Sequence, residues 1–139
     1  MKEHWYEKGV FSCDMSDLVG RTMKEVKKVG SDEIHMICDE GTFKFYHRQD
    51  CCETVEIESI VGDLNDLVGH PILMAEESTS DSTPEGFNHD YEPESQTWTF
   101  YKFATIKGYV DIRWFGSSNG YYSEEVDLRF EASTKENSN

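Results

Sequence analysis

The amino-acid sequence predicts a mainly β domain of the α+β class, with an antiparallel sheet of about six to eight strands and one or two short helices. Three features of the sequence carry this prediction. Apolar and polar residues alternate with a period of two in several segments, as they do in half-buried strands. Turn sequences, among them Gly30-Ser31-Asp32 and Glu40-Gly41, separate these segments. The tetrapeptide Asp-Leu-Val-Gly (DLVG) also occurs twice, at 17–20 and at 66–69.

The repeated tetrapeptide predicts two similar halves, each opened by a DLVG turn. Ser16 and Asn65 precede the two copies and are candidate N-caps of a short helical turn. Gly20 and Gly69 end the copies, at a point where a positive φ costs little. Each copy also precedes a run of strand-like segments. The alternative is chance identity of a common tetrapeptide.

In the first half, the alternation predicts four strands: Thr22–Val29, Glu33–Asp39, Thr42–Arg48 and Glu53–Ile60. The apolar positions of these strands fall on one face, because successive side chains point to opposite sides of a strand. The expected core positions are Ile34, Met36, Cys38, Phe43, Phe45, Val55 and Ile57. The polar positions between them, such as Lys44, Glu56 and Glu58, are expected to face water.

In the second half, the same pattern predicts four more strands: Ile72–Glu77, Thr97–Thr105, Tyr109–Phe115 and Glu125–Phe130. Ile106-Lys107-Gly108 is expected to join the middle pair as a turn. The expected core positions of the last two strands are Val110, Ile112, Trp114, Val126, Leu128 and Phe130.

We expect the chain to comprise an N-terminal extension (1–15), a single β-rich domain (16–130) and a flexible tail (131–139). A long acidic loop is expected within the domain at residues 76–95, which contain seven acidic residues, two prolines and no Lys or Arg. Self-repulsion and the missing proline N–H groups disfavour a strand there. The composition favours a mobile loop, although loops of this length are often functional.

The charge of the chain excludes several classes of partner. With 13 Lys and Arg against 28 Asp and Glu among 139 residues, the formal net charge is −15. A field of this sign repels nucleic-acid phosphates and anionic lipids, so direct binding to nucleic acid or a membrane is not expected. An apolar run of about 18 residues, which would suit a transmembrane helix, is missing. The N-terminus has no secretory signal pattern, so we expect a cytoplasmic protein.

Motifs of common active sites are missing from the sequence. It contains no G-x-S-x-G nucleophile motif and no glycine-rich phosphate-binding loop. We therefore expect a protein that is not an enzyme and that uses no cofactor. Because the chain has 28 acidic residues, a close pair of carboxylates is inevitable and does not indicate glycoside hydrolysis.

Histidines and cysteines near one predicted hairpin are candidate zinc ligands: His35, Cys38, His47, Cys51 and Cys52. Their spacing matches no common zinc motif, and His35 and Cys38 fall on opposite faces of one strand because their separation is odd. We expect no metal site, and instead a buried Cys38, a surface His35 and a partly buried cysteine pair. In a reducing compartment all four cysteines, including Cys13, are expected to be reduced thiols.

The densest candidate ligand site lies on the two longest predicted strands of the second half and in the loop that follows. Tyr109, Asp111 and Arg113 share the face opposite the apolar positions, and Tyr101 and Phe103 on the neighbouring strand are expected alongside them. The predicted ligand-binding residues are Tyr101, Phe103, Tyr109, Asp111, Arg113, Asn119, Tyr121 and Tyr122.

This set of residue types suits a flat, anionic ligand. Aromatic rings stack on a purine, the Arg113 guanidinium binds phosphate through two hydrogen bonds, and the Asn119 amide reads the edge of a base or ribose. Gly116 and Gly120 permit close approach of the backbone. The alternative is purely structural, because aromatic pairs stabilise sheets and Asp111 with Arg113 forms an ordinary surface pair.

A basic group occupies the first predicted strand and its approach: Arg21, Lys24, Lys27 and Lys28. Lysines on an edge strand prevent edge-to-edge aggregation, which is the favoured interpretation. Local binding of an anion is the alternative.

Two longer passages carry a family resemblance. DCCETVEIESIVGDLNDLVGHPIL and TWTFYKFATIKGYVDIRWFGSSNGYYSEEVDL, together with the DLVG copies, resemble a small domain family of unknown function found chiefly in phage and prophage proteins. The similarity covers about Ser16 to Phe130. The resemblance implies a phage accessory protein in the host cytoplasm.

Phage proteins of this size often counter host defence, which leads to two functional hypotheses. The first is a nucleotide sponge, similar in idea to the Thoeris anti-defence proteins, which are small β-rich oligomers that sequester cyclic nucleotides without cleaving them. It implies a homo-oligomer whose partner is a cyclic nucleotide or another small anionic ligand. The second is an acidic nucleic-acid mimic that binds a host defence nuclease, as some anti-CRISPR proteins do.

Overall fold

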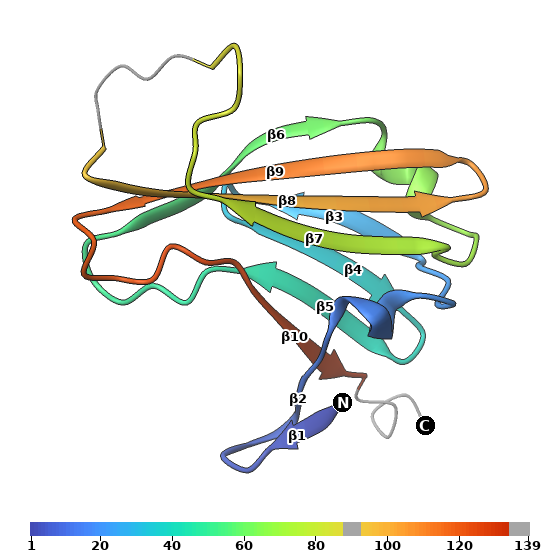
Figure 1. Ribbon diagram of the computed structural model, residues 1–139. Helices are drawn as coiled ribbons and strands as arrows, with labels where there is room; N and C mark the ends of the chain where they lie inside the picture. Colours follow the sequence, from blue (N-terminus) through green and yellow to red (C-terminus); the bar gives the residue numbers. More distant parts are fainter. Residues whose placement is uncertain (88–92, 134–139) are drawn as a thin grey trace.

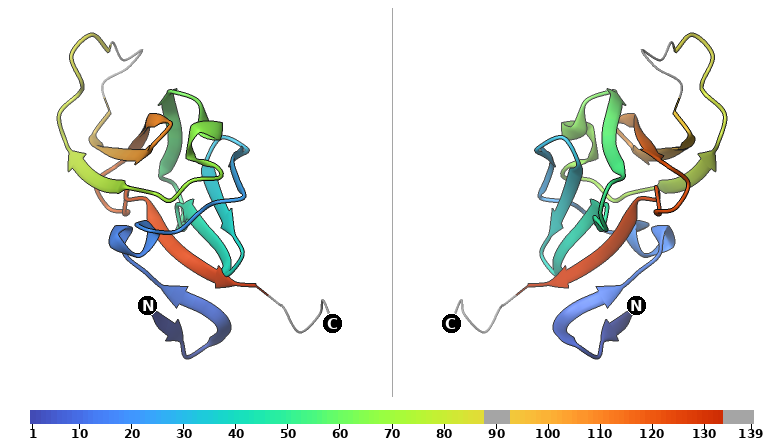
Figure 2. Two further views of the ribbon diagram at one scale, coloured as in Figure 1. Left: turned by 90° about the vertical axis from the view of Figure 1, so that its right-hand side faces the viewer. Right: turned by 90° about the vertical axis from the view of Figure 1, so that its left-hand side faces the viewer.

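The computed structural model describes residues 1–87 and 93–133, which form two antiparallel β-sheets packed face to face (Figure 1, Figure 2). The first sheet has the order β1 (Lys2–His4), β2 (Glu7–Ser12), β10 (Asp127–Ala132), β5 (Gly41–Tyr46), β4 (Glu33–Cys38) and β3 (Glu25–Val29). The second sheet has the order β6 (Thr54–Val61), β9 (Gly108–Ser118), β8 (Ser95–Thr105) and β7 (Met74–Ser80). The 3₁₀ helices η1 (Met15–Leu18) and η2 (Leu64–Leu67) lie beside the sheets.

The predicted fold class is confirmed. All eight predicted strands are present as β3 to β10, with ends that shift by a few residues, and the two short helices are the 3₁₀ turns of the DLVG copies. The chain forms two further strands, β1 and β2, within the segment expected to be an extension, and β2 pairs with β10. The first residues are therefore part of the first sheet, in which they form a hairpin that projects beyond the second sheet (Figure 1).

The chain consists of two similar halves that exchange a strand, so the prediction from the repeat is confirmed. After η1, strands β3, β4 and β5 are neighbours in the first sheet; after η2, strands β7, β8 and β9 are neighbours in the second. The next strand of each half joins the other sheet, because β6 pairs with β9 and β10 pairs with β5. Each sheet thus depends on a strand from the other half.

The glycine of each DLVG copy forms a hydrogen bond with the segment that follows the other copy. The Gly20 amide donates to the Ile72 carbonyl at 2.8 Å, and the Gly69 amide donates to the Met23 carbonyl at 2.9 Å. Both glycines have a positive φ, 90° and 85°, which a residue without Cβ adopts readily. The repeat is therefore the point at which the two halves join.

Each DLVG turn also inserts one leucine, Leu18 or Leu67, which is fully buried in the core. The N-caps are Asp14 and Asp63, and not Ser16 and Asn65 as expected. The helical turns begin earlier than the tetrapeptide suggests, because an aspartate at each cap position bonds the first turn: the Asp14 amide donates to Asp17, and Asp63 accepts from the Asn65 amide.

Inward-facing positions of the first half have counterparts in the second half. Counted from the hairpin glycines Gly41 and Gly108, Ile34 corresponds to Tyr101, Met36 to Phe103, Phe43 to Val110 and Phe45 to Ile112. Each of these eight side chains is at most 2% exposed. The Phe45 ring meets Tyr101 at 4.9 Å and Phe103 at 5.7 Å between ring centroids, so the two sheets share one core. Full burial of one such side chain contributes about 1.5–3 kcal/mol.

The acidic loop is shorter than expected. Residues 76–80 belong to β7 and Ser95 begins β8, which leaves 81–94 as the connection, of which 88–92 lie outside the described residues. Glu76 and Glu77 are compatible with a strand because β7 is an edge strand whose side chains are largely exposed to water. At the other end, β10 takes in Glu131 and Ala132, and the rest of the predicted tail, 134–139, lies outside the described residues.

The oxidation state of the cysteines differs from expectation for one pair. Cys51 and Cys52 form a disulfide, whereas Cys13 and Cys38 are free thiols. The expectation of four reduced thiols is therefore wrong for this pair, and so is its expected partial burial, because both residues lie in the exposed connection between β5 and β6. His35 and Cys38 lie on opposite faces of β4 as predicted, with His35 bonded to Glu33 at 2.7 Å and Cys38 buried. Across the residues that the structure describes, no helix is long and apolar enough to cross a bilayer.

Candidate functional site

The candidate site lies on the outer face of the second sheet, which we define as the face turned away from the first sheet. The strand period places Phe100 and Lys102 of β8 on this face, directly opposite Arg113 and Asp111 of β9 in the strand register. Glu76 and Ser78 of β7 continue the same rows, because they pair with Lys102 and Phe100.

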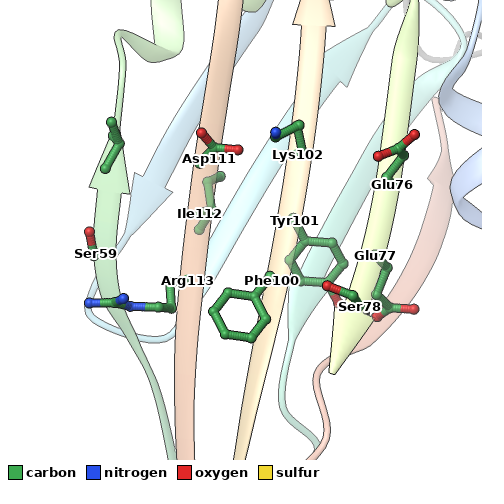
Figure 3. Close-up of a pocket in the computed structure, with 11 residues that line it drawn as sticks. Ser59, Glu76, Glu77, Ser78, Phe100, Tyr101, Lys102, Asp111, Ile112 and Arg113 are labelled. Carbon is green, nitrogen blue, oxygen red and sulfur yellow. Dashed lines mark hydrogen bonds between the residues drawn. The ribbon is translucent and has the colours of Figure 1, made fainter. Parts of the chain in front are cut away.

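A groove of about 870 Å³ crosses this face (Figure 3). Its volume is in the range of small-molecule sites in proteins, about 300–1,000 Å³. We call it the outer groove; it is lined by Ser59, Val61, Glu76, Glu77, Ser78, Phe100, Tyr101, Lys102, Asp111, Ile112 and Arg113. Figure 3 shows Asp111 beside Lys102, and Phe100 and Arg113 further along the same two strands.

Arg113 is held by two contacts at the edge of the outer groove. Its Nε donates to Oε1 of Glu58 at 2.6 Å, and Nη2 forms an ion pair with the same oxygen at 2.6 Å. The guanidinium carbon also lies 5.3 Å from the centroid of the Trp98 ring, which is fully buried. A cation over an aromatic face gains about 0.5–1 kcal/mol at a surface site. The guanidinium is therefore positioned before any ligand arrives.

The groove carries charges of both signs. Lys102 and Arg113 supply two cations, and Glu76, Glu77 and Asp111 supply three carboxylates. Lys102 is exposed, and its ammonium lies 6.0 Å from the Tyr109 ring. Phe100 is half-buried and presents an aromatic ring in the row that contains Arg113, next to the row of Glu76, Lys102 and Asp111. This surface offers cations for an oxyanion, carboxylates for N–H donors and a ring for stacking.

The structure brings together three of the predicted site residues. Tyr109, Asp111 and Arg113 share the outer face as predicted, and Asp111 and Arg113 line the outer groove. Tyr109 is 64% exposed and lies at the start of β9, with its ring beside the Lys102 ammonium.

The expected position of Tyr101 and Phe103 beside Arg113 is wrong. Both side chains belong to the core and are 2% and 1% exposed, although Tyr101 is also one of the residues that line the outer groove. The register pairs Arg113 with Phe100, so the residues that flank the guanidinium on β8 are the even-numbered ones. The Tyr101 hydroxyl donates to Glu77 at 2.8 Å, and burial, with the Glu77 charge beside it, raises the pKa of Tyr101.

The loop residues Asn119, Tyr121 and Tyr122 also lie away from the outer groove. They follow the end of β9 at Ser118, whereas Arg113 lies in the middle of that strand. The Asn119 side-chain oxygen accepts the Tyr121 amide at 2.9 Å, and Tyr121 is 88% exposed. The amide expected to read a ligand is therefore engaged in a local turn.

Several lining residues were missed at the sequence level, namely Ser59, Glu76, Ser78, Phe100 and Lys102. The positions of Phe100 and Lys102 opposite Arg113 and Asp111 follow from the register of the β8–β9 hairpin, which the turn at Lys107-Gly108 fixes. The lining residues on β6 and β7 could not be predicted from the local sequence, because their place in the groove depends on which strands become neighbours in the sheet.

The basic group at the start of the first half has a structural role. Lys27 and Lys28 lie on β3, an edge strand, in keeping with the favoured interpretation. Arg21 lies over Phe43 and Phe130, with its guanidinium carbon 5.2 and 5.5 Å from their centroids.

Comparison with known proteins identifies a family. No curated protein and no solved structure matches the chain. The family model described as a domain of unknown function, DUF7448, matches residues 16–128. The match begins at η1 and ends in β10, so it spans both halves of the repeat and leaves out the β1–β2 hairpin. The chain belongs to this family of domains of unknown function.

Proposed function

We propose that this protein is a phage-encoded anti-defence protein of the host cytoplasm that binds a cyclic nucleotide signal in the outer groove and sequesters it without cleaving it. The observation that carries the proposal is the outer groove itself, in which the half-buried Phe100 ring lies opposite Arg113 of β9 and two residues from Lys102 on its own strand. Stoichiometric capture requires affinity and makes no demand for a nucleophile or a metal.

The chemistry of the groove matches the parts of a nucleotide. Phe100 offers a face on which a base stacks, and Arg113 with Lys102 offers charge-assisted hydrogen bonds to phosphate. Asp111 and Glu76 supply acceptors for the exocyclic amino group of a purine or pyrimidine. A ligand that carries both an anionic group and N–H donors suits this mixed surface better than a simple anion.

Calorimetric titration with cyclic and linear nucleotides tests the proposal. We expect saturable heat with a cyclic nucleotide, and a ligand of unchanged mass after it is released by heating. Recovery of an altered nucleotide would show an enzyme, and absence of heat with every nucleotide would overturn the proposal.

Two arginine variants locate the site. Arg113→Ala removes a charged hydrogen-bond donor and is expected to weaken nucleotide binding about tenfold or more. Arg129→Ala is the matched control, because Arg129 also pairs with a glutamate and lies over an aromatic ring, but on the first sheet. Equal affinity of the two variants would place the site elsewhere. Thermal unfolding checks that both variants are folded.

An acidic mimic of nucleic acid is the second candidate function, and the net charge of −15 favours it. Glu56, Glu58, Glu76 and Asp111 place carboxylates on three strands of the outer face, where they resemble a row of phosphates to a basic groove. This function predicts binding to a host nuclease that weakens steeply with salt, together with no heat from nucleotides.

The proposed sponge is also expected to be a homo-oligomer. Strands β1 and β3 are the edges of the first sheet and β6 and β7 those of the second, and sheet edges pair readily with another copy of a chain. Light scattering of the purified protein measures this directly, and a monomer at all concentrations would contradict it.

A further inference from the structure

Strand β6 contains one extra residue opposite Arg113. Ile57 pairs with Trp114 and Ser59 pairs with Arg113, so Glu58 between them is an added residue at a β-bulge. Glu56 faces outward before the bulge, and Ser59 faces outward after it. Two consecutive polar residues of β6, Glu58 and Ser59, therefore lie next to Arg113. Bulges re-aim side chains and are common next to binding sites.

The Glu58 carboxylate occupies the position that an anionic ligand needs. One of its oxygens accepts a hydrogen bond from Nε of Arg113 and forms an ion pair with Nη2, both at 2.6 Å, and the side chains of Glu58 and Arg113 remain 27% and 31% exposed. Arg113 lines the outer groove, so the carboxylate neutralises one of its two cations in the free protein.

We propose that Glu58 is a built-in competitor for the anion position on Arg113, and that a phosphate entering the outer groove takes its place. This inference rests on the proposed function for the identity of the ligand. The Glu58 carboxylate and a ligand oxyanion cannot both bind the Nε–Nη2 side of the guanidinium, because two negative charges in contact with the same site repel each other.

The surroundings allow this exchange without movement of Arg113. The Trp98 face, 5.3 Å from the guanidinium carbon, still holds the arginine when the carboxylate leaves. Glu58 lies at a bulge on an edge strand, where its backbone is less constrained than in the centre of a sheet. The carboxylate therefore moves and the guanidinium stays.

The exchange selects ligands by charge. A phosphate group, with more acceptor oxygens than a carboxylate, compensates for the lost pair, whereas a neutral base or sugar does not. The pair is partly exposed, so displacement of Glu58 reduces the affinity of anions by at most about fivefold and does not abolish binding.

The test compares Glu58→Gln with Glu56→Gln by calorimetry, using a cyclic dinucleotide and inorganic pyrophosphate as probes. Both variants remove one negative charge from the same face of β6, but Glu56 pairs in register with Phe115 and not with Arg113. We expect Glu58→Gln to bind the cyclic dinucleotide about fivefold more tightly than Glu56→Gln does. Circular dichroism confirms folding of both variants.

Each outcome decides between the two claims. Tighter binding of both probes by Glu58→Gln supports the inference and the proposed function. Tighter binding of pyrophosphate by Glu58→Gln, with no binding of the cyclic dinucleotide by either variant, supports the displacement of Glu58 and overturns the nucleotide function. Equal and measurable binding of the cyclic dinucleotide by the two variants keeps the function and overturns the inference. Failure of both variants to bind either probe overturns both.

Discussion

On the outer face of the first sheet, Lys44 and Arg129 both bind the Glu131 carboxylate, at 2.9 and 2.7 Å. On the outer face of the second sheet, Arg113 binds Glu58 at the edge of a groove of about 870 Å³. Arg129 also lies over Tyr46, 4.7 Å from the ring centroid. Burial raises the pKa of Glu131, but Lys44 and Arg129 outweigh it and hold that pKa below its ordinary value. Lys44, Arg129 and Glu131 thus form a network of paired charges on the first face.

The two faces occupy equivalent positions of the repeat. Counted from Gly41 and Gly108, Tyr46 corresponds to Arg113 and Lys44 corresponds to Asp111. The inward positions of both halves stay apolar because they fill one shared core. The outward positions have no such constraint, and there the halves differ. The comparison indicates that the repeat supplies the two-sheet framework. The candidate site comes from outward-facing residues of the second half that differ from their counterparts in the first.

The strongest test of the equivalence is a pair of core truncations. Leu18 and Leu67, at matching positions of η1 and η2, are both fully buried. We expect Leu18→Ala and Leu67→Ala each to lower the free energy of unfolding by about 2–5 kcal/mol, through lost burial and the cavity left behind. Urea denaturation measures both values, and a difference between them of more than about 2 kcal/mol would break the equivalence.

The hairpin glycines sharpen the comparison, because they match in conformation and differ in surroundings. Gly41 and Gly108 have φ values of 156° and 150°. A Cβ on Gly41 would collide with the Glu131 carbonyl of β10, whereas the nearest atom to a Cβ on Gly108 is an Asp66 carboxylate oxygen at 3.5 Å.

We therefore expect Gly41→Ala to destabilise the fold by about 2–3 kcal/mol or more, since β10 has to shift. Gly108→Ala should cost only about 1 kcal/mol, from its backbone conformation. Thermal unfolding of the two variants measures the difference. A larger loss for Gly108→Ala would contradict the exchanged-strand packing around Gly41.

Glu53, in the connection between β5 and β6, is expected to make the free energy of unfolding depend on pH in the acidic range. The buried Glu53 carboxylate accepts the Cys51 and Asp50 amides at 3.0 and 2.8 Å and binds His47 Nε2 at 2.6 Å. These hydrogen bonds, that of the Cys51 amide foremost, lower the pKa of Glu53 from 4.5 to about 2.

A carboxylate whose pKa is depressed by folding stabilises the native state above its unfolded pKa. This contribution is complete above about pH 4.5 and is lost as the pH falls toward 2. Glu53→Gln should be less stable than the wild type at pH 7 and should lose less stability across this window. Urea denaturation at several pH values measures both slopes, and parallel slopes would exclude this role for Glu53.

Period-two alternation located all eight strands of the repeated unit, and the DLVG copies predicted its two halves, because both signals are local. The same reasoning assigned Arg113 and Asp111 to the outer face correctly. It placed Tyr101 and Phe103 beside them incorrectly, because alternation within a strand does not specify the register with its neighbour. Glu58 had no detectable role in the sequence, since a bulge exists only relative to a partner strand.

The amino-acid sequence by itself determined the β class, the strand positions and the relation between the halves. These follow from side-chain periodicity and turn chemistry, which act within a few residues. Only the tertiary structure decided that β6 and β10 change sheets, and therefore which strands flank β8 and β9. The outer groove depends on that choice, because its lining comes from β6, β7, β8 and β9, and strand neighbours are selected by long-range packing of the shared core.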